Sequence, residues 1–367
     1  MDRIKKFIDC YVPVENCNFK CHYCYISHLE HFNNKTIKIE KSPQFIREAL
    51  SKERLGGVCM LNFCAGGETL ISNDVIPIVA ELLKEGHYVM IVTNGSLTSK
   101  FEEISKLDER LLKRLFIKFS FHYLELCRLN LLDTFKRNVD LMKKSGVSYT
   151  IEVMPNDEII KYIDEIKRFC LDNFGAFPHV TVARKENGNI PMLTSLSKEK
   201  YIKTWSVFNS SLFDFKIKIF GEKRKEFCYA GDWSFILNLA TGDVKQCYRG
   251  ITYQNIYSNI KEPIKKLAVG NNCVEPHCFN GHAFLAFGDI PNIDSTDFAQ
   301  LRNRETSGEM WIKPTMCQFM KTKLYESNEE YSKKMKIKVN IVNRIYFLKN
   351  DFKKKIKKIL HKKEGTV

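Results

Sequence analysis

The chain has 367 residues, 44% of them hydrophobic and 12% aromatic, which is enough for two or three folded domains and excludes a disordered protein. Its 58 Lys and Arg residues against 43 Asp and Glu give a formal charge of +15. Thirteen of the basic residues and only two acids lie in residues 333–367, so the remaining 332 residues carry +4. Because a nucleic-acid-binding protein usually spreads its basic residues over the folded domain, we expect no nucleic-acid partner.

The sequence contains neither a membrane-spanning segment nor a signal peptide by composition. No apolar run approaches the roughly 20 residues of a spanning helix, and the first residues are charged. We therefore expect a cytoplasmic protein. In such a reducing compartment, 13 cysteines favour metal ligands or redox groups over disulfides.

Strand-like and helical patterns alternate in the first half of the chain, which predicts β/α units and a parallel sheet. The expected strands are Phe7–Val14, Val58–Cys64, Tyr88–Thr93, Leu115–Phe121, Ser148–Met154 and His179–Ala183. The expected helices are Ser42–Glu53, Asp74–Glu85, Asp133–Lys144 and Asp157–Asp172. Six such units predict a partial (β/α)6 barrel of the TIM type, with its chemistry in the loops that follow the strands.

The pattern changes near residue 221 to short strands, turns and clustered cysteines. We expect a barrel domain over residues 1–220, a small α+β domain over residues 221–325 and a basic amphipathic tail over residues 326–367.

Three cysteines follow the first expected strand. Cys17, Cys21 and Cys24 form a C-x3-C-x2-C pattern, which chance would produce only about 0.016 times in a chain of this composition. Structural zinc is one interpretation, with His22 or His28 as the fourth ligand. Three thiolates on a [4Fe–4S] cluster would instead leave one iron open to a substrate or cofactor. We favour the cluster.

This loop resembles that of the radical S-adenosylmethionine (SAM) superfamily, with Tyr23 as the aromatic residue before the last cysteine. Further matches follow in order: Gly66-Gly67-Glu68 after the second expected strand, Asn94 after the third and Ser120 at the end of the fourth. The resemblance implies that the three cysteines hold a [4Fe–4S] cluster and that the other residues contact SAM.

The resemblance also implies an activity. The cluster would cleave SAM reductively to a 5′-deoxyadenosyl radical that abstracts hydrogen from a substrate, with an external electron donor such as flavodoxin or ferredoxin. By their positions after strands, His122, Glu152 and Arg184 are the candidate catalytic residues, and Asn156 is a further candidate for the cavity. An ordinary surface or ion-pair role for each of them is an equal alternative.

A second set of cysteines lies in the expected small domain. The spacing of Cys228, Gly242 and Cys247 resembles the start of the SPASM/twitch domains, which carry auxiliary iron–sulfur clusters. Together with Cys273 and Cys278, these cysteines could hold a second [4Fe–4S] cluster, although zinc is an alternative for four thiolates. A further possible ligand is Cys317, whereas His277 and His282 are expected beside the site and not as ligands.

The tail has an apolar helical face and a basic one. The apolar face consists of Ile341, Ile345, Leu348, Phe352, Ile356 and Ile359, and the lysines beside it are Lys349, Lys353, Lys354, Lys357 and Lys358. This pattern is typical of a helix that lies on an anionic membrane surface, here the inner face. Docking of the same face on the barrel and a solvated tail are the alternatives.

For the substrate, we expect a sugar-like or lipid-linked small molecule that the enzyme oxidises or rearranges with help from the auxiliary cluster. Only 16 residues precede Cys17, which leaves no room for a fused peptide-recognition domain. The alternatives are a radical SAM enzyme that modifies peptides or proteins, a non-catalytic iron–sulfur or zinc protein at the membrane and, less favoured by the charge, RNA modification.

Overall fold

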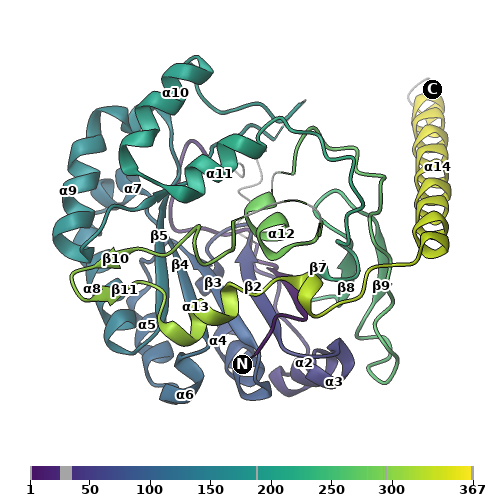
Figure 1. The fold of residues 1–367 in the computed structure, drawn as a ribbon, viewed down its shortest axis with the longest axis horizontal. Coiled ribbons are helices and arrows are strands. Elements are labelled where there is room, and N and C mark those ends of the chain that lie inside the picture. The colour runs from purple at the N-terminus through teal and green to yellow at the C-terminus, as the bar shows by residue number, and fades with distance from the viewer. Residues whose placement is uncertain are drawn as a thin grey trace.

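The computed structural model describes residues 2–24, 35–186, 189–278, 280–291, 293 and 296–364, and for residues 349–364 it describes the backbone alone. One large sheet dominates the structure (Figure 1). Its strands are β1 (Lys6–Val12), β2 (Cys59–Ala65), β3 (Tyr88–Thr93), β4 (Leu115–Ser120), β5 (Ser148–Val153), β6 (His179–Val180), β7 (Ser234–Asn238), β8 (Asp243–Lys245) and β9 (Thr252–Asn255).

The strand order is β6-β5-β4-β3-β2-β1-β7-β8-β9, and every pair from β6 to β7 is parallel. The predicted α/β fold with parallel units is therefore confirmed. Among the described residues β6 and β9 pair with no further strand, so the sheet is open and the barrel is partial. Of the six expected strands, β6 is much shorter than the predicted His179–Ala183, because the chain turns away from β5 after Val180.

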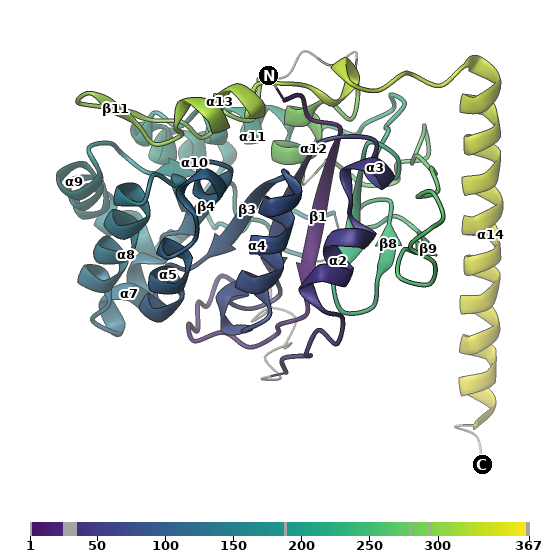
Figure 2. The ribbon, with the colours of Figure 1, turned by 90° about the horizontal axis from the view of Figure 1, so that it is seen from below.

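The helices between these strands lie on the outer face of the sheet (Figures 1 and 2). They are α2 (Pro43–Ala49), α3 (Lys52–Leu55), α4 (Val75–Glu85), α5 (Thr98–Ser105), α6 (Glu109–Leu112), α7 (Tyr123–Arg128), α8 (Leu132–Lys144) and α9 (Ile163–Phe174), with the 3₁₀ helices η1 (Thr69–Ile71) and η2 (Asp157–Tyr162). The predicted helix Ser42–Glu53 is in fact two helices, because Ser51 accepts a hydrogen bond from Arg54 N and starts a new one.

The remaining elements are α10 (Lys198–Trp205), η3 (Ser206–Phe208), α11 (Ser211–Ile219), α12 (Gly281–Phe287), β10 (Glu305–Thr306), β11 (Glu309–Met310), α13 (Pro314–Met320), η4 (Leu324–Glu326) and α14 (Lys333–Glu364). Strand β7 lies in the expected second domain, yet it pairs with β1 in the centre of the sheet. A domain boundary near residue 221 stays a prediction.

Residues 296–326 cross the N-terminal ends of the parallel strands, where α13 lies across the sheet in Figure 1. Just before β1, Ile4 N donates to Thr322 Oγ1 at 3.0 Å. At the start of β3, the ring of Tyr88 stacks on Phe319 with 3.7 Å between centroids. This segment closes one end of the sheet, so only the C-terminal ends of the strands remain for a site.

Helix α14 extends beyond the body of the molecule and lies beside β9 (Figure 2). In the described part of the chain, no helix combines the length and apolar character that crossing a membrane requires.

We predict that Trp311→Ala destabilises the protein strongly. Trp311 is 1% exposed, stacks on Tyr149 with 5.4 Å between centroids and donates from Nε1 to the Phe174 carbonyl at 3.1 Å. Loss of this ring should lower the free energy of unfolding, measured in urea, by about 3–5 kcal/mol. The neighbouring Met310 is 47% exposed, so Met310→Ala should cost less than about 0.5 kcal/mol. Equal losses would contradict a role for the buried ring.

Candidate functional site

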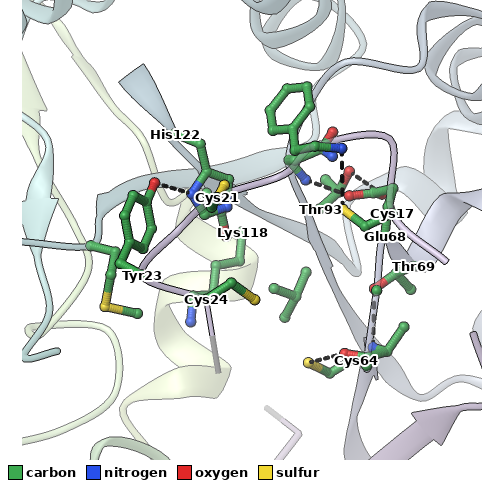
Figure 3. A pocket seen from close by; sticks show the side chains of 18 of the residues that line it. Cys17, Cys21, Tyr23, Cys24, Cys64, Glu68, Thr69, Thr93, Lys118 and His122 are labelled. Atoms are coloured by element: carbon green, nitrogen blue, oxygen red, sulfur yellow. Dashed lines mark hydrogen bonds between the residues drawn. The ribbon is translucent and has the colours of Figure 1, made fainter. Parts of the chain in front are cut away.

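A cavity of about 280 Å³ lies at the C-terminal ends of the parallel strands. Every one of the strands β1 to β6, or the loop directly after it, contributes to the lining. The lining residues with sulfur or ionisable side chains are Cys17, Cys21, Tyr23, Cys24, Cys64, Glu68, Lys118, His122, Met154, Arg184, Glu186 and Lys216, most of them visible in Figure 3. This is the end of the sheet at which the sequence predicted the chemistry.

The cysteine loop follows β1 and brings all three thiols to this cavity. Helix α7 fixes the loop, because Glu125 Oε2 accepts a hydrogen bond of 2.7 Å from Lys20 N, and Arg128 in turn holds Glu125. Burial raises the pKa of Cys17 to about 11 and that of Cys21 to about 12. These thiols are therefore protonated at neutral pH, and a metal group that binds them must displace their protons.

The three thiols line one cavity, but among the described residues no three His, Cys, Asp or Glu side chains form a group that could hold a single metal ion. A zinc site would need its thiolates at about 2.3 Å from one centre. A [4Fe–4S] cluster held by these three thiols stays a prediction. Of the two candidate zinc ligands, His22 pairs with Glu158 at 3.2 Å, and His28 lies outside the described residues.

The loop after β2, the second loop, contains two glycines that let its backbone contact the backbone of the cysteine loop. Gly67 N donates to the Val14 carbonyl at 2.7 Å, and Glu68 N donates to the Asn16 carbonyl at 3.0 Å. A Cβ on Gly67 would overlap the carbonyl of Asn16, whereas a Cβ on Gly66 would lie 3.2 Å from the Val14 oxygen. Only glycine fits at position 67.

Glu68 ties the second loop to the third. One carboxylate oxygen accepts from Thr93 Oγ1 at 2.7 Å and from Leu70 N at 3.0 Å, and the other accepts from Asn94 N at 2.7 Å. Burial raises the pKa of Glu68, and these donors oppose the shift. The carboxylate therefore joins β2 to β3, and its contact with an amino group of SAM stays a prediction.

A closed set of three hydrogen bonds joins the third loop to the cysteine loop. Asn94 Nδ2 donates to Asn18 Oδ1 at 2.8 Å, Asn18 Nδ2 donates to Ser96 Oγ at 2.8 Å, and Ser96 Oγ donates to Asn94 Oδ1 at 2.6 Å. Sequence reasoning found Asn94 but missed Asn18, which stands inside the cysteine motif, and Ser96, which lies two residues after Asn94. With Glu68, this set fixes the loops after β1, β2 and β3 in one arrangement.

Tyr23 and His122 meet across the cavity from the loops after β1 and β4. The Tyr23 hydroxyl and His122 Nδ1 are hydrogen-bonded at 2.7 Å, as Figure 3 shows. Burial lowers the pKa of His122 to about 4, so this imidazole is neutral at pH 7. It is therefore suited to orient the Tyr23 ring. Ser120 lines the same wall.

The other candidates for substrate contact differ in their surroundings. Arg184 lines the cavity and pairs with Glu186 at 2.9 Å. Glu152 is not in the lining; although burial opposes its charge, Lys118 at 3.0 Å and Arg302 hold its pKa at about 2. Its position is that of an ion-pair residue.

Asn156 is also absent from the lining, and its side chain donates to the Met154 carbonyl at 3.2 Å. Two further lining residues were missed by the sequence reasoning. Lys118 lies within β4 and Lys216 within α11, where the strand and helix patterns concealed them.

The second set of cysteines converges on another cavity. Cys228, Cys247, Cys273 and Cys278 all line a space of about 60 Å³ beside α12. Burial raises the pKa of Cys247 to about 11, and the neighbouring Cys273 contributes. These thiols too share no single-ion centre with other ligands among the described residues. Cys317, on α13, is not part of this lining.

We predict that Gly67→Ala prevents assembly of the site. Its methyl group would push the second loop away from Asn16 and displace the cysteine loop. Iron bound after anaerobic reconstitution should fall at least about fivefold, a loss that corresponds to about 1 kcal/mol or more. The matched variant Gly66→Ala meets only the 3.2 Å contact and should retain iron. Equal iron content in the two variants would contradict the role of the backbone contact.

Comparison with known proteins gives a family match over the first half of the chain. Residues 11–170 match the family model described as the Radical SAM superfamily. A protein of Methanocaldococcus jannaschii, provisionally named as a glycyl-radical enzyme activating enzyme, is 30% identical over 93 residues, which make up 25% of this chain and 34% of that protein. The match therefore spans about a third of the relative's length.

Solved structures show weaker likeness. SuiB of Streptococcus suis bound to S-adenosylmethionine is 15% identical with a TM-score of 0.47, over 70% of this chain and 64% of that chain. The protein anSMEcpe with bound AdoMet and a peptide is 16% identical with a TM-score of 0.47, over 70% and 80%. BtrN in complex with AdoMet and 2-DOIA is 14% identical with a TM-score of 0.33, over 71% and 82%.

The family match covers the cysteine loop, strands β2 to β5 and the loops that join them around the cavity. A domain of this family implies a [4Fe–4S] cluster and SAM as cofactors. Residues 11–170 therefore form a radical SAM domain.

Proposed function

We propose that the protein cleaves SAM reductively at a [4Fe–4S] cluster held by Cys17, Cys21 and Cys24 and abstracts hydrogen from a substrate in the same cavity. The observation that carries the proposal is the convergence of these three thiols on a cavity to which all six β/α strands contribute. When bound, the cluster supplies the electron that splits SAM into methionine and the 5′-deoxyadenosyl radical.

The residues of the chain would hold and orient SAM. Gly66, Gly67 and Asn94 line the cavity on loops that are already joined to the cysteine loop, so their backbone positions are fixed before SAM binds. Ser120 and Tyr23 line the same cavity. A preorganised site of this kind orients SAM with little further loss of conformational entropy.

The second set of cysteines supports an auxiliary [4Fe–4S] cluster in a twitch-like domain over residues 221–325. All four proposed ligands line one small cavity, and Cys317 is elsewhere, so the set Cys228, Cys247, Cys273 and Cys278 is complete without it. Such a cluster can accept the electron left on a substrate radical, which makes oxidation of a small sugar-like or lipid-linked molecule the favoured reaction. A reduced flavodoxin or ferredoxin would supply the first electron.

Modification of a peptide or protein is the second candidate. Peptide is named with two of the structurally similar proteins, SuiB and anSMEcpe, but that association belongs to those proteins. Incubation in ordinary water with candidate small molecules and peptides that are deuterated at selected positions distinguishes the two candidate functions. Deuterium in 5′-deoxyadenosine identifies the molecule that loses hydrogen. A non-catalytic metal protein, the third candidate, would form no 5′-deoxyadenosine.

Helix α14 supports attachment to an anionic membrane surface from the cytoplasm. Its polar side docks on the body: Asn343 is fully buried and donates to the Ala268 carbonyl at 2.8 Å, and Asn340 accepts from Asn271 N. At 100° per residue, Ile337, Ile341 and Leu348 lie on the opposite side and are 52–71% exposed.

The apolar face is therefore not docked on the barrel between residues 337 and 348, contrary to one alternative from the sequence. Lys334, Lys338 and Arg344 flank it, as required for contact with anionic lipid. The other residues of this face, Phe352, Ile356 and Ile359, and the lysines from Lys349 onward lie outside the side chains that the structure describes.

We predict that Cys17→Ala, Cys21→Ala and Cys24→Ala together abolish formation of 5′-deoxyadenosine from SAM and dithionite after anaerobic reconstitution. The product should fall at least about a thousandfold, because no ligand for the SAM-binding cluster remains. Iron and sulfide, measured in parallel, should each fall by about four atoms per chain from about eight.

The matched control is the alanine set at Cys228, Cys247, Cys273 and Cys278. It should lose the other four irons and still cleave SAM, whereas Cys317→Ala should lose no iron. Zinc without sulfide in the wild-type protein, or no product from a protein with full iron and sulfide, would defeat the proposed function.

We predict that Ile341→Glu with Ile345→Glu prevents sedimentation with vesicles of phosphatidylserine and phosphatidylcholine, because two charges enter the exposed apolar face. The bound fraction should fall at least tenfold, while SAM cleavage is unchanged. Met335→Glu with Val342→Glu carries the same charge at exposed positions of another side of α14 and should still bind. Equal loss in both pairs would show that net charge alone governs binding and would refute the apolar contact.

A further inference from the structure

One wall of the cavity carries an excess of positive charge. Lys118 from β4, Arg184 after β6 and Lys216 from α11 all line it. Two of these cations have carboxylate partners: Lys118 pairs with Glu152 at 3.0 Å and Arg184 with Glu186 at 2.9 Å. Glu152 also pairs with the fully buried Arg302 at 2.9 Å, so the carboxylates present do not balance the cations.

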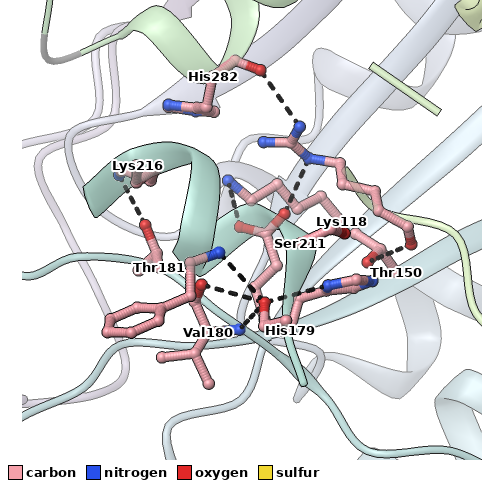
Figure 4. A network of polar contacts seen from close by, with 12 residues as sticks. Lys118, Thr150, His179, Val180, Thr181, Ser211, Lys216 and His282 are labelled. Carbon is pink, nitrogen blue, oxygen red and sulfur yellow. Dashed lines mark hydrogen bonds and ion pairs between the residues drawn. The ribbon is translucent and has the colours of Figure 1, made fainter. Parts of the chain in front are cut away.

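Lys216 is the cation without a counter-charge. It is 7% exposed, and its Nζ donates to the Thr181 hydroxyl at 2.6 Å, as Figure 4 shows. No ion pair joins it to a carboxylate among the described residues. Burial, with Arg184 and Lys118 nearby, lowers the pKa of Lys216. An ammonium group in this position is unfavourable unless an anion approaches it.

A second unsatisfied group lies in the same region. His282, at the start of α12, has a buried Nδ1 with no hydrogen-bond partner in the described part of the chain. Burial lowers the pKa of His282 as well, and the cations that act on it are Lys216, Arg302, Lys118 and Arg184. Figure 4 shows His282 and Lys216 on neighbouring helices around this network. Lys216 therefore lacks a counter-charge that a ligand in the cavity could supply, and His282, which does not line the cavity, is an unsatisfied buried group beside the same cations.

The carboxylate of SAM does not account for this wall. In the proposed function SAM would bind at the cluster that the cysteine loop after β1 would hold. Arg184 and Lys216 belong to the other edge of the parallel sheet, beyond β6, and four strands separate β1 from β6. This placement favours a second molecule, and not SAM, as the source of an anion at Lys216.

We propose that Lys216 and Arg184 bind an oxyanion of the substrate, either a phosphate or a carboxylate, and that the substrate of the proposed reaction is therefore an anionic small molecule. This inference rests on the proposed function for the identity of the reaction only. Arg184 can donate two parallel hydrogen bonds to such a group, and Lys216 supplies the buried charge. The contacts would hold the substrate in the cavity that the cysteine loop also lines.

The test is calorimetric titration of the cluster-loaded protein with inorganic phosphate and, separately, with acetate, first without SAM and then at saturating SAM. We expect one of the two anions to bind and Lys216→Gln to weaken it at least tenfold. Lys218→Gln is the matched control, since Lys218 is exposed on the same helix, and it should stay within twofold of wild type. Arg184→Gln, at a partly exposed position, is a second variant and should weaken binding at least fivefold.

Each outcome decides the proposal. Preference for phosphate or acetate identifies the oxyanion. Three results would overturn the proposal. Anion binding that SAM abolishes would assign the cations to SAM, and equal weakening by Lys216→Gln and Lys218→Gln would show an effect of general surface charge. Absence of binding of either anion to the fully loaded wild-type protein would show that the site takes no oxyanion. Urea unfolding of both Gln variants controls for folding. If anions bind as expected but SAM is not cleaved, the proposed function fails and the anion site stands.

Discussion

The site depends on one contact between two backbones, that of Gly67 against Asn16. Because the second loop rests directly on the cysteine loop, Glu68 comes within reach of Asn94, and Asn94 within reach of Asn18. Three loops that are distant in sequence are thereby fixed as one unit before any cofactor binds. Burial raises the pKa of Cys17 and Cys21 in this unit, so a metal group that binds these thiols would have to displace their protons.

Much of the fold and part of the site could be predicted from the sequence. Five of the six expected strands agree with the structure within about two residues, because each is a buried apolar run between clear turns. The C-x3-C-x2-C loop and the Gly-Gly-Glu element lie together because both follow strands of one parallel sheet. Prediction was weaker where tertiary pairing decides: β6 is short because it lies at an edge, and β7 joins β1 across more than 220 residues, which no local pattern encodes.

The positive wall shows a different limit of sequence reasoning. Lys118 stands in a strand and Lys216 in a helix, where a lysine normally faces water. Only the three-dimensional arrangement shows that both face the cavity and that Glu152, expected as a catalytic residue, is held by Lys118 and Arg302. In helix α14 the apolar face was identified from the sequence. The asparagines that dock the other side of the helix on the body, and so leave the apolar face exposed, were not recognised.

The place of β1 at the centre of the sheet constrains how the chain can fold. Among the described strands β1 comes first in the sequence, yet it is paired on both sides only when residues 234–238 are present, and Ile4 just before it receives its partner only with Thr322. Until β7 is present, the cysteine loop follows a strand that has one unpaired edge. The cavity itself is lined by residues from Cys17 to Lys216, so a group that enters the finished cavity has to wait until the chain beyond α11 has been made.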